Sequence, residues 1–444
     1  MAERSGQLLA PATPTYVLRG HSTPIHALHI FSQNLRLISG DADGWIVIWD
    51  LVTKRPVTVW KAHRGAVLEV KGFSQVSGGT EIYTHGRDHK LCVWRIRLED
   101  EPFLDKTLPV EAFELDKERL EKRAQPWLLH SLPVNALNFC AFSIAFIDTS
   151  GATSLGNTQK QETSTRAQIL FAVPNAMDSG GIDIFHLPSE RRVTTIKSDP
   201  AVQTGMLMAV SIFVGPLSDL YVASAYEDGQ VMVFTYKEPL TSASFEASNI
   251  SSNPWKWERI YVCRPHSQPV LSIDVAPTCD YFISSSADAL IIKHPIPGPV
   301  TVDDVPIVNY MEESPLKTID TKHSGQQGIR IRNDGKIFAT AGWDSRVRVY
   351  SAKTMKELAV LKWHKDGCYC IVFGEINPTS QSTPSIPSND TGTEWTIQQP
   401  DQQIVQARSF SLTAIQNQRS QKVQHTHWLA AGSKDGKISL WDIY

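Results

Sequence analysis

Histidine, hydroxyl, aspartate and aromatic residues recur along the chain in one order and at one spacing. An aspartate follows a Ser or Thr by four positions, an aromatic residue follows the aspartate by six, and a histidine stands upstream. The full set occurs twice, as His21, Ser39, Asp43 and Trp49 and as His63, Thr84, Asp88 and Trp94. These residue types could carry acid–base chemistry, but their repetition favours a structural role.

Four further copies keep the spacing with at least one member missing. They are Ser224, Asp228 and Phe234; Ser284, Asp288 and His294; Thr340, Asp344 and Tyr350; and Ala431, Asp435 and Trp441. A seventh copy, at 171–187, is blurred and has Asp178 one position out of register. Each aspartate stands alone in its own copy, so none belongs to a pair of catalytic acids. Because GxSxG, GxxxxGK[ST], HExxH, GxGxxG and CxxC motifs are also absent, the sequence predicts a non-enzymatic protein with no catalytic residue, cofactor or metal site.

Each copy has the pattern of two short strands joined by a turn. Segments 46–49, 91–94, 231–234, 347–350 and 438–441 alternate apolar residues with a β-branched bias. The Asp and Gly between the two strands suit a tight turn. A further strand, headed by a histidine in most copies, precedes each pair. A period of roughly 40–50 residues with this content predicts stacked β units.

The dipeptides at the ends of these units resemble those of WD40 repeats. Gly20-His21 opens the first unit, and Trp49-Asp50 and Trp441-Asp442 close two of them. The resemblance implies four-stranded blades of a β-propeller, each held by a buried hydrogen-bonded chain of His, Ser or Thr, turn Asp and Trp. Where a member is missing, we expect the blade to depend more on apolar packing.

Seven copies predict an all-β fold, a seven-bladed WD40 β-propeller closed by an N-terminal strand. The last copy has no segment after it for an outer strand, and Thr15 to Leu18 precede the first copy without a blade of their own. We therefore expect residues 14–19 to pair antiparallel with 437–443, which removes two sheet edges. The chain is predicted to be one propeller over 1–444, with blades near 20–60, 61–98, 125–198, 199–240, 260–300, 318–360 and 361–444.

Three segments interrupt the repeats. Residues 97–124 are densely charged and are predicted to be either a solvated linker or a partner-docking arm. Residues 149–166 are small and polar and are expected to form a flexible loop. The largest insertion, 375–424, lies between the first and second strands of the last blade; its Ser, Thr, Pro and Gln content predicts disorder.

Composition narrows the functional classes. The formal net charge of −3 argues against a dedicated nucleic-acid binder, which would carry a basic surplus. No apolar run is long enough to predict a membrane span. The six cysteines lie mostly singly in strand patterns and fit an intracellular compartment.

A second resemblance extends over almost the whole chain outside the insertions. The segments 125–143 and 180–193, the opening PTYVLRGHSTPIHALHIF and the terminal AAGSKDGKISLWDIY are similar to the fungal ASTRA-associated protein 1 family. The resemblance implies a scaffold subunit of the ASTRA complex, involved in chromatin remodelling or organisation and in the assembly or stability of phosphatidylinositol-3-kinase-related kinases. It further implies these kinases, their co-chaperones and RuvB-like ATPases as partners, and a nuclear location, with a cytoplasmic pool as an alternative.

Two other functions stay open at this point. A G-protein β-like adaptor would carry a long N-terminal helix, but only 14 residues, rich in Pro and Ala, precede Thr15. A cullin-ligase substrate receptor would often show Trp-Asp-x-Arg at a blade end. Here Trp49-Asp50 is followed by Leu51-Val52, and Trp94 is followed directly by Arg95. Neither alternative is excluded, and the sequence leaves open which face of the propeller would bind a partner.

Overall fold

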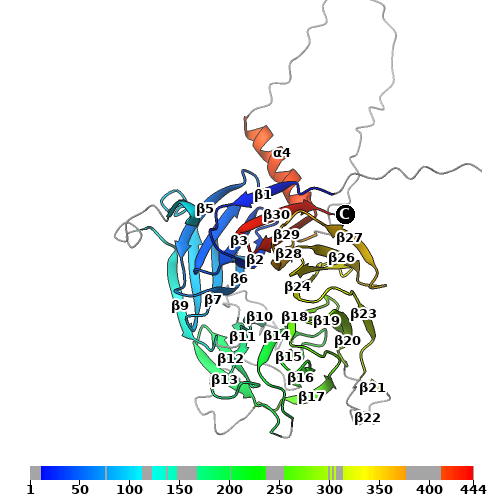
Figure 1. Ribbon diagram of the computed structural model, residues 1–444. Coiled ribbons are helices and arrows are strands. Elements are labelled where there is room, and N and C mark those ends of the chain that lie inside the picture. The colour runs from blue at the N-terminus through cyan, green and yellow to red at the C-terminus, as the bar shows by residue number, and fades with distance from the viewer. Residues whose placement is uncertain are drawn as a thin grey trace, which may run out of the picture.

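Seven four-stranded antiparallel sheets surround a common centre as the blades of a β-propeller (Figure 1). The computed structural model describes residues 12–75, 78–112, 123–136, 139–147, 168–200, 202–236, 255–298, 301–302, 305–306, 314–376 and 412–443. The predicted all-β class and the seven blades are confirmed.

In each blade the first strand lies nearest the centre and the last strand lies at the rim (Figure 1). The first blade contains β2 (Ile25–Phe31), β3 (Arg36–Asp41), β4 (Trp45–Asp50) and β5 (Arg55–Lys61). The second contains β6 (Val67–Ser74), β7 (Gly79–Gly86), β8 (Lys90–Arg97) and β9 (Trp127–Pro133). The third contains β10 (Ser143–Ile147), β11 (Gln168–Pro174), β12 (Ile182–Leu187) and β13 (Arg191–Ile196).

The remaining blades follow in chain order. The fourth contains β14 (Leu207–Val214), β15 (Leu220–Tyr226), β16 (Val231–Tyr236) and β17 (Glu258–Cys263). The fifth contains β18 (Val270–Val275), β19 (Tyr281–Ser286), β20 (Leu290–Pro295) and β23 (Lys317–Asp320). The sixth contains β24 (Gln326–Ile331), β25 (Ile337–Gly342), β26 (Val347–Ser351) and β27 (Glu357–Leu361). The seventh contains β28 (Cys368–Phe373), β29 (Trp428–Ser433), β30 (Lys437–Asp442) and β1 (Tyr16–Arg19).

The outer strands of three blades lie further along the chain than the predicted boundaries allow. β9 pairs with β8, so it belongs to the second blade and not to a third blade beginning at 125. In the same way β17 completes the fourth blade and β23 the fifth. In each case the segment between the third and fourth strands is long; in the fifth blade it contains the small β21 (Thr301–Val302) and β22 (Val305–Pro306) pair. An outer strand has one free edge and no repeat motif, so the spacing did not reveal it.

The apolar core is divided into seven clusters, and each cluster joins two neighbouring blades. One cluster, for example, joins Ile38 and Trp60 of the first blade to Val70 and Trp94 of the second. Another joins the seventh blade to the first, through Leu440 and Leu37 among others. A middle strand therefore buries both of its faces, and every residue of β16 is buried. This explains why such strands contain nearly continuous apolar runs.

The N-terminal strand closes the ring as predicted. β1 runs antiparallel to β30, with Tyr16 opposite Leu440 and Arg19 opposite Lys437. Leu18 is 2% exposed and packs in the cluster between the seventh and first blades. Strands from the two ends of the described chain thus complete one blade.

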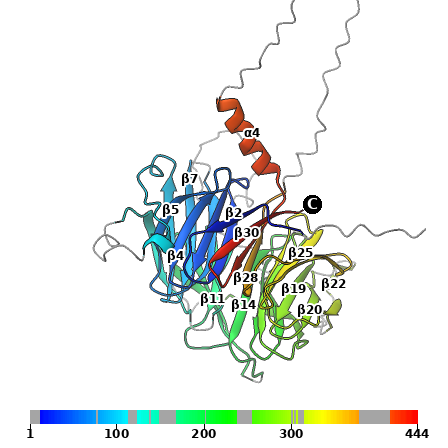
Figure 2. The same ribbon diagram turned by 45° about the horizontal axis from the view of Figure 1, so that its top comes forward.

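Helical structure is confined to short segments of the described residues. α1 (Pro109–Ala112) lies in the charged 97–124 insertion. α4 (Leu412–His425) lies in the largest insertion, where disorder was predicted; it projects from the propeller body near β1 and β30 (Figures 1 and 2). Its last turn is anchored, because Val423 is buried and its carbonyl accepts the Trp428 indole N–H at 2.9 Å. The flexible loop expected at 149–166 and the disorder expected at 377–411 lie outside the described residues. Among the described helices, none is long and apolar enough to cross a membrane.

One buried side chain of the first blade holds both ends of the largest insertion. The Asn34 amide donates to the carbonyl oxygens of Glu375 at 2.7 Å and Gln424 at 3.0 Å. Its oxygen accepts the Glu375 N–H at 2.8 Å. Asn34 adopts φ of 65°, a conformation that Asn tolerates better than most residues. The segment that leaves β28 and the segment that returns to β29 are therefore tied to the same point.

The first prediction concerns the closing strand. Leu18→Ala should lower the free energy of unfolding by about 2–4 kcal/mol, because it leaves a cavity between two blades. Tyr16→Ala on the same strand is the matched control, since Tyr16 is 44% exposed, and it should cost less than about 1 kcal/mol. Urea titration of both variants measures the difference. Equal costs would show that β1 does not pack as described.

Candidate functional site

The second blade contains the complete hydrogen-bonded chain. The His63 ring bonds to Asp88 through Nδ1 at 2.9 Å and to the Thr84 hydroxyl through Nε2 at 2.8 Å. The Trp94 indole N–H donates to the same hydroxyl at 3.0 Å. Partial burial alone would raise the pKa of Asp88, but hydrogen bonds from His63 and from the Arg64 amide lower it overall. Because an ionised carboxylate can only accept, Nδ1 carries the proton in the bond to Asp88.

In the first blade the aspartate of the chain is Asp41 and not Asp43. His21 bonds to Asp41 through Nδ1 at 2.7 Å and to Ser39 through Nε2 at 2.7 Å, and Trp49 donates to Ser39 at 2.9 Å. Asp41 is fully buried, whereas Asp43 is half-buried at the turn. The prediction for Asp43 is therefore wrong, although the other three residues meet as expected.

The local backbone explains this replacement. Asp41 occupies the position that Gly86 occupies in the second blade, where a Cβ would lie 2.3 Å from the His63 ring. A side chain at this position points directly at the histidine, so a carboxylate placed there reaches it without help from the turn. The second oxygen of Asp41 accepts the amides of Asp43 at 3.0 Å and Trp45 at 2.9 Å, which fixes the turn.

The fifth blade keeps its hydrogen-bonded chain without a tryptophan. His266 bonds to Asp288 at 3.1 Å and to Ser284 at 2.8 Å. His294, which stands where Trp was expected, bonds to Ser284 through Nε2 and to the Tyr261 hydroxyl through Nδ1, both at 2.8 Å. Desolvation and the nearby His266 hold the pKa of His294 well below its ordinary value. This blade was expected to depend more on apolar packing, but its hydrogen-bonded chain is present, because a neutral imidazole offers both a donor and an acceptor.

The seventh blade supplies its hydroxyl group from a different strand. Ala431 lacks a hydroxyl, but Ser439 lies directly opposite it on β30. The Ser439 hydroxyl bonds to His364 at 2.8 Å and accepts the Trp441 indole N–H at 2.8 Å. Burial lowers the pKa of His364 to about 4. Ser439 thus restores the link between His364 and Trp441 that Ala431 was expected to interrupt, whereas Asp435 bonds to Lys437 and stays outside the chain.

The other repeated aspartates have different partners. Asp435 pairs with Lys437 at 2.5 Å. Asp344 accepts from Arg348 at 3.1 Å. Asp228 accepts the amide two residues on at 3.0 Å and so stabilises its turn. Each of these carboxylates acts within its own blade, and the described residues contain no group of His, Cys, Asp or Glu that could hold a metal ion.

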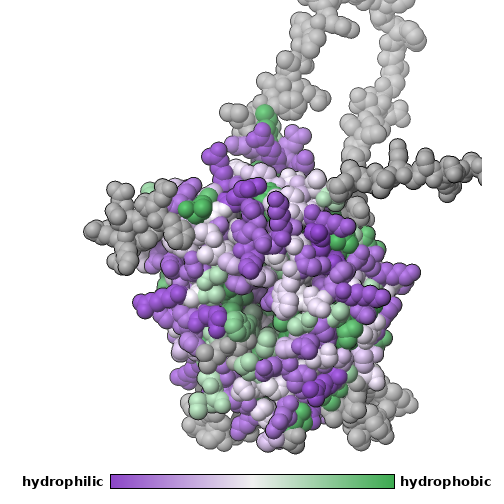
Figure 3. Space-filling view, viewed as in Figure 1, coloured by the Kyte–Doolittle hydropathy of each residue, from purple (hydrophilic) through white to green (hydrophobic). Residues whose placement is uncertain are grey.

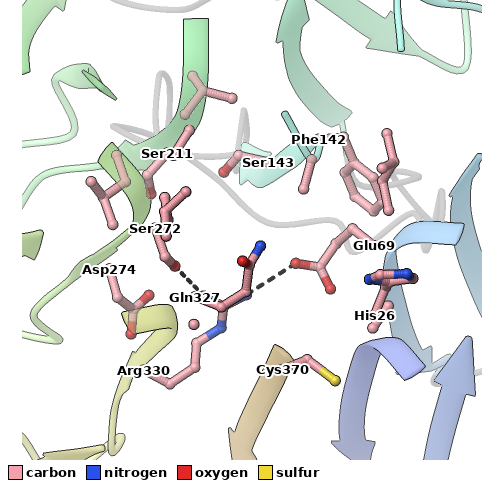
Figure 4. A pocket seen from close by; sticks show the side chains of 18 of the residues that line it. His26, Glu69, Phe142, Ser143, Ser211, Ser272, Asp274, Gln327, Arg330 and Cys370 are labelled. Carbon is pink, nitrogen blue, oxygen red and sulfur yellow. Dashed lines mark hydrogen bonds and ion pairs between the residues drawn. The ribbon is translucent and has the colours of Figure 1, made fainter. Parts of the chain in front are cut away.

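Charged side chains also gather where the innermost strands meet. These strands line a central cavity of about 300 Å³ (Figure 4). Arg330 of the sixth blade pairs with Glu69 of the second at 3.1 Å, so this ion pair crosses the cavity, which we call the channel. Arg330 also donates to the Ser272 hydroxyl at 3.4 Å. Asp274 accepts the Ile331 amide at 2.6 Å, and burial raises its pKa while Arg330 opposes the shift.

Comparisons with known proteins identify the family. A family model described as ASTRA-associated protein 1 matches residues 14–441. A protein of that name from Penicillium rubens is 64% identical over all of both chains, and one from Aspergillus flavus is 58% identical over 99% of each. One from Schizosaccharomyces pombe is 33% identical over 81% of this chain and 93% of its own.

The chain belongs to the ASTRA-associated protein 1 family. The family match begins two residues before β1 and ends one residue before the end of β30, so both strands that close the ring lie almost entirely within it. In this member of the family, the blade chains described above join strands and turns of the same blade.

Sequence reasoning missed the residues that line the channel. Glu69, Lys71 and Arg330 stand inside apolar strand patterns, in VLEVKGF and GIRI. A charged residue within an innermost strand could have indicated a buried ion pair, since ionisable groups are rarely buried unless they are paired. The repeat spacing gave no indication that strands of the second and sixth blades face each other across the centre.

The second prediction separates the two aspartates of the first blade. Asp41→Ala should cost about 2–4 kcal/mol of unfolding free energy, because it leaves a buried imidazole and two backbone amides without their acceptor. Asp43→Ala is the matched control and should cost less than about 1 kcal/mol. Urea titrations of the two variants make the comparison. A larger loss for the Asp43 variant would return that residue to the hydrogen-bonded chain.

The third prediction concerns pH. The pKa of His364 is about 4 in the folded protein and near 6.5 when unfolded, so the unfolded state binds more protons between these values. The stabilisation is complete above about pH 6.5 and is lost as pH falls, by about 1 kcal/mol at pH 5.5. His364→Gln should therefore lose less stability between pH 7 and pH 5.5 than the unchanged protein. His425→Gln, at an exposed position of α4, should follow the unchanged protein; identical profiles for all three would refute the prediction.

Proposed function

We propose that the protein is a non-enzymatic scaffold subunit of the ASTRA complex. In this role it would support chromatin remodelling or organisation and the assembly or stability of phosphatidylinositol-3-kinase-related kinases. Its partners would be these kinases, their co-chaperones and RuvB-like ATPases, and its location would be mainly the nucleus. The observation that carries the proposal is the family match over residues 14–441, whose description names association with ASTRA.

The structure supports a scaffold rather than an enzyme. Repeated His and Asp residues bond to each other within single blades, as in the second and fifth. In the centre, Glu69 and Arg330 pair with each other. A ring of blades that are packed on both sides is rigid and offers two faces and a rim to partners. No step of catalysis needs to be assigned to it.

The motif of the ligase-receptor alternative finds no counterpart at the first blade end. Asp50 accepts the amides of Val52 at 2.8 Å and Thr53 at 2.7 Å and pairs with Arg36. Asp50 therefore stabilises the turn that follows Trp49. Val52 stands at the position where such receptors often have Arg.

The fourth prediction tests the proposed complex. A tagged copy at the native locus should enrich phosphatidylinositol-3-kinase-related kinases, their co-chaperones and RuvB-like ATPases over a tag-only control in quantitative mass spectrometry. Depletion of the protein should lower the steady-state amount of those kinases. Enrichment of a cullin and its adaptor, or of a G-protein γ chain, without the kinases would overturn the proposal.

A further inference from the structure

The innermost strands place one side chain from almost every blade at the same mouth of the channel. In six of the seven blades the pairing of the first two strands shifts register just after the innermost strand begins. The extra residue is half-buried and lines the central cavity in each case. These residues are His26, Leu68, Met208, Leu271, Gln327 and Tyr369. A bulge of this kind re-aims a side chain, and bulges are frequent beside binding sites.

The third blade completes the ring by other means. It has no register shift, but Phe139, just before β10, also lines the cavity. Phe139 is 59% exposed and adopts φ of 57°, which is uncommon for a bulky residue. Its ring lies 3.9 Å from the Arg87 guanidinium. We call these seven residues, His26, Leu68, Phe139, Met208, Leu271, Gln327 and Tyr369, the mouth ring.

The mouth ring is mostly apolar and aromatic, and three of its members make defined contacts with aromatic rings. His26 and Tyr369 stack with ring centres 5.4 Å apart and planes at 7°. The side chain of Gln327 accepts the Trp343 indole N–H at 2.8 Å, and Trp343 is half-exposed beside it. In the space-filling view a hollow lies at the middle of the propeller, with apolar side chains along its border (Figure 3).

Inside the mouth ring the wall of the channel is polar, and one of its charged groups has no bonded partner. Glu69 and Arg330 satisfy each other, and Asp274 accepts a backbone amide. Lys71 lines the same cavity, and its ammonium has no hydrogen-bond or ion-pair partner among the residues that the structure describes. Desolvation lowers the pKa of Lys71, and the carboxylates of Glu69 and Asp274 oppose this only in part.

Serine hydroxyl groups line the same cavity. Ser143, Ser211 and Ser272 point toward it from three different blades (Figure 4). Ser143 accepts the Ile212 amide at 2.9 Å, and Ser272 accepts the Ile329 amide at 3.3 Å. Each hydroxyl hydrogen can therefore still be donated. An ammonium without a bonded partner, in a cavity that also holds hydroxyl donors, is suited to a carboxylate.

We propose that the mouth ring and Lys71 form a docking site for a short segment of a partner protein in which an acidic residue is flanked by apolar or aromatic residues. The acidic side chain enters the channel toward Lys71, and its neighbours pack on the mouth ring. A single acidic side chain is consistent with a cavity of about 300 Å³. The inference rests on the proposed scaffold function and deepens it, because it states the chemistry of one partner segment.

Peptide binding to the full-length protein tests the site directly. The probes are capped, fluorescein-labelled peptides that alternate Phe with Glu, Phe with Gln, or Phe with Lys. The Glu peptide should bind at least about ten-fold more tightly than the other two in fluorescence anisotropy. Preference for the Lys peptide, or equal binding of all three, would overturn the proposal.

Variants assign the preference to named residues. Lys71→Met should remove the advantage of the Glu peptide over the Gln peptide, whereas Lys71→Arg should retain it. Phe139→Ala should weaken both peptides alike. Trp127→Ala is the control, because Trp127 is 71% exposed on the outer strand β9, away from the channel, and it should change neither. A Lys71→Met protein that melts normally and keeps the Glu preference would refute the role of the ammonium.

A separate measurement keeps this proposal distinct from the function on which it rests. Co-purification of the kinases and co-chaperones is compared for the unchanged protein, Lys71→Met and Trp127→Ala. Loss of the complex only in Lys71→Met supports the mouth as its docking site, whereas retention in both overturns that assignment. Absence of the complex with the unchanged protein would refute the scaffold function, while the peptide measurement would still decide whether the site binds acidic segments.

Discussion

Every blade of this protein is apolar on both faces, and the rest of the structure depends on that constraint. A sheet with two apolar faces cannot be stable with water on either side, so each blade needs a neighbour in both directions. The ring is the arrangement that supplies two neighbours to all seven. Its last cluster joins residues of the seventh and first blades and includes Leu18 of β1. Closure of the ring by β1 is therefore needed to bury the apolar faces between the seventh and first blades.

The same constraint explains which parts of the fold could be predicted from the sequence. Middle strands such as β4 and β8 lie between two clusters, carry the repeated motif and were found by their spacing. The pairing of β1 with β30 followed from counting strands. The outer strands β9 and β17 escaped, because a rim strand is partly exposed and needs no distinctive residues. α4 was not predicted because its polar sequence has no apolar stripe, and its buried residue Val423 lies in the last turn.

The candidate sites show a different limit. Spacing along the chain identified where a hydrogen-bonded group is needed, but several side chains can reach the same point in space. Asp41 reaches His21 from a neighbouring position, and Ser439 reaches His364 from the opposite strand. His294 takes the place of an indole because its two nitrogens meet two hydroxyl groups. What recurs in the first, second, fifth and seventh blades is a bond between a buried histidine and a hydroxyl group, and a pattern of residue names records that bond only in part. The cross-channel pair of Glu69 and Arg330 belongs to the same class, because it joins blades that are far apart in sequence.

The bonds of Asn34 have a consequence for how the protein can vary. One amide side chain fastens the departing segment at Glu375 and the returning segment at Gln424. The insertion between these two points is therefore a loop with fixed ends, and a change in its length leaves the positions of those ends the same. Because the entropy of closing a loop grows only slowly with length, such an insertion can lengthen or shorten at little cost to the blade that carries it. Because Asn34 fixes both ends of the insertion, sequence can be gained or lost at this position of the seventh blade while the ring remains intact.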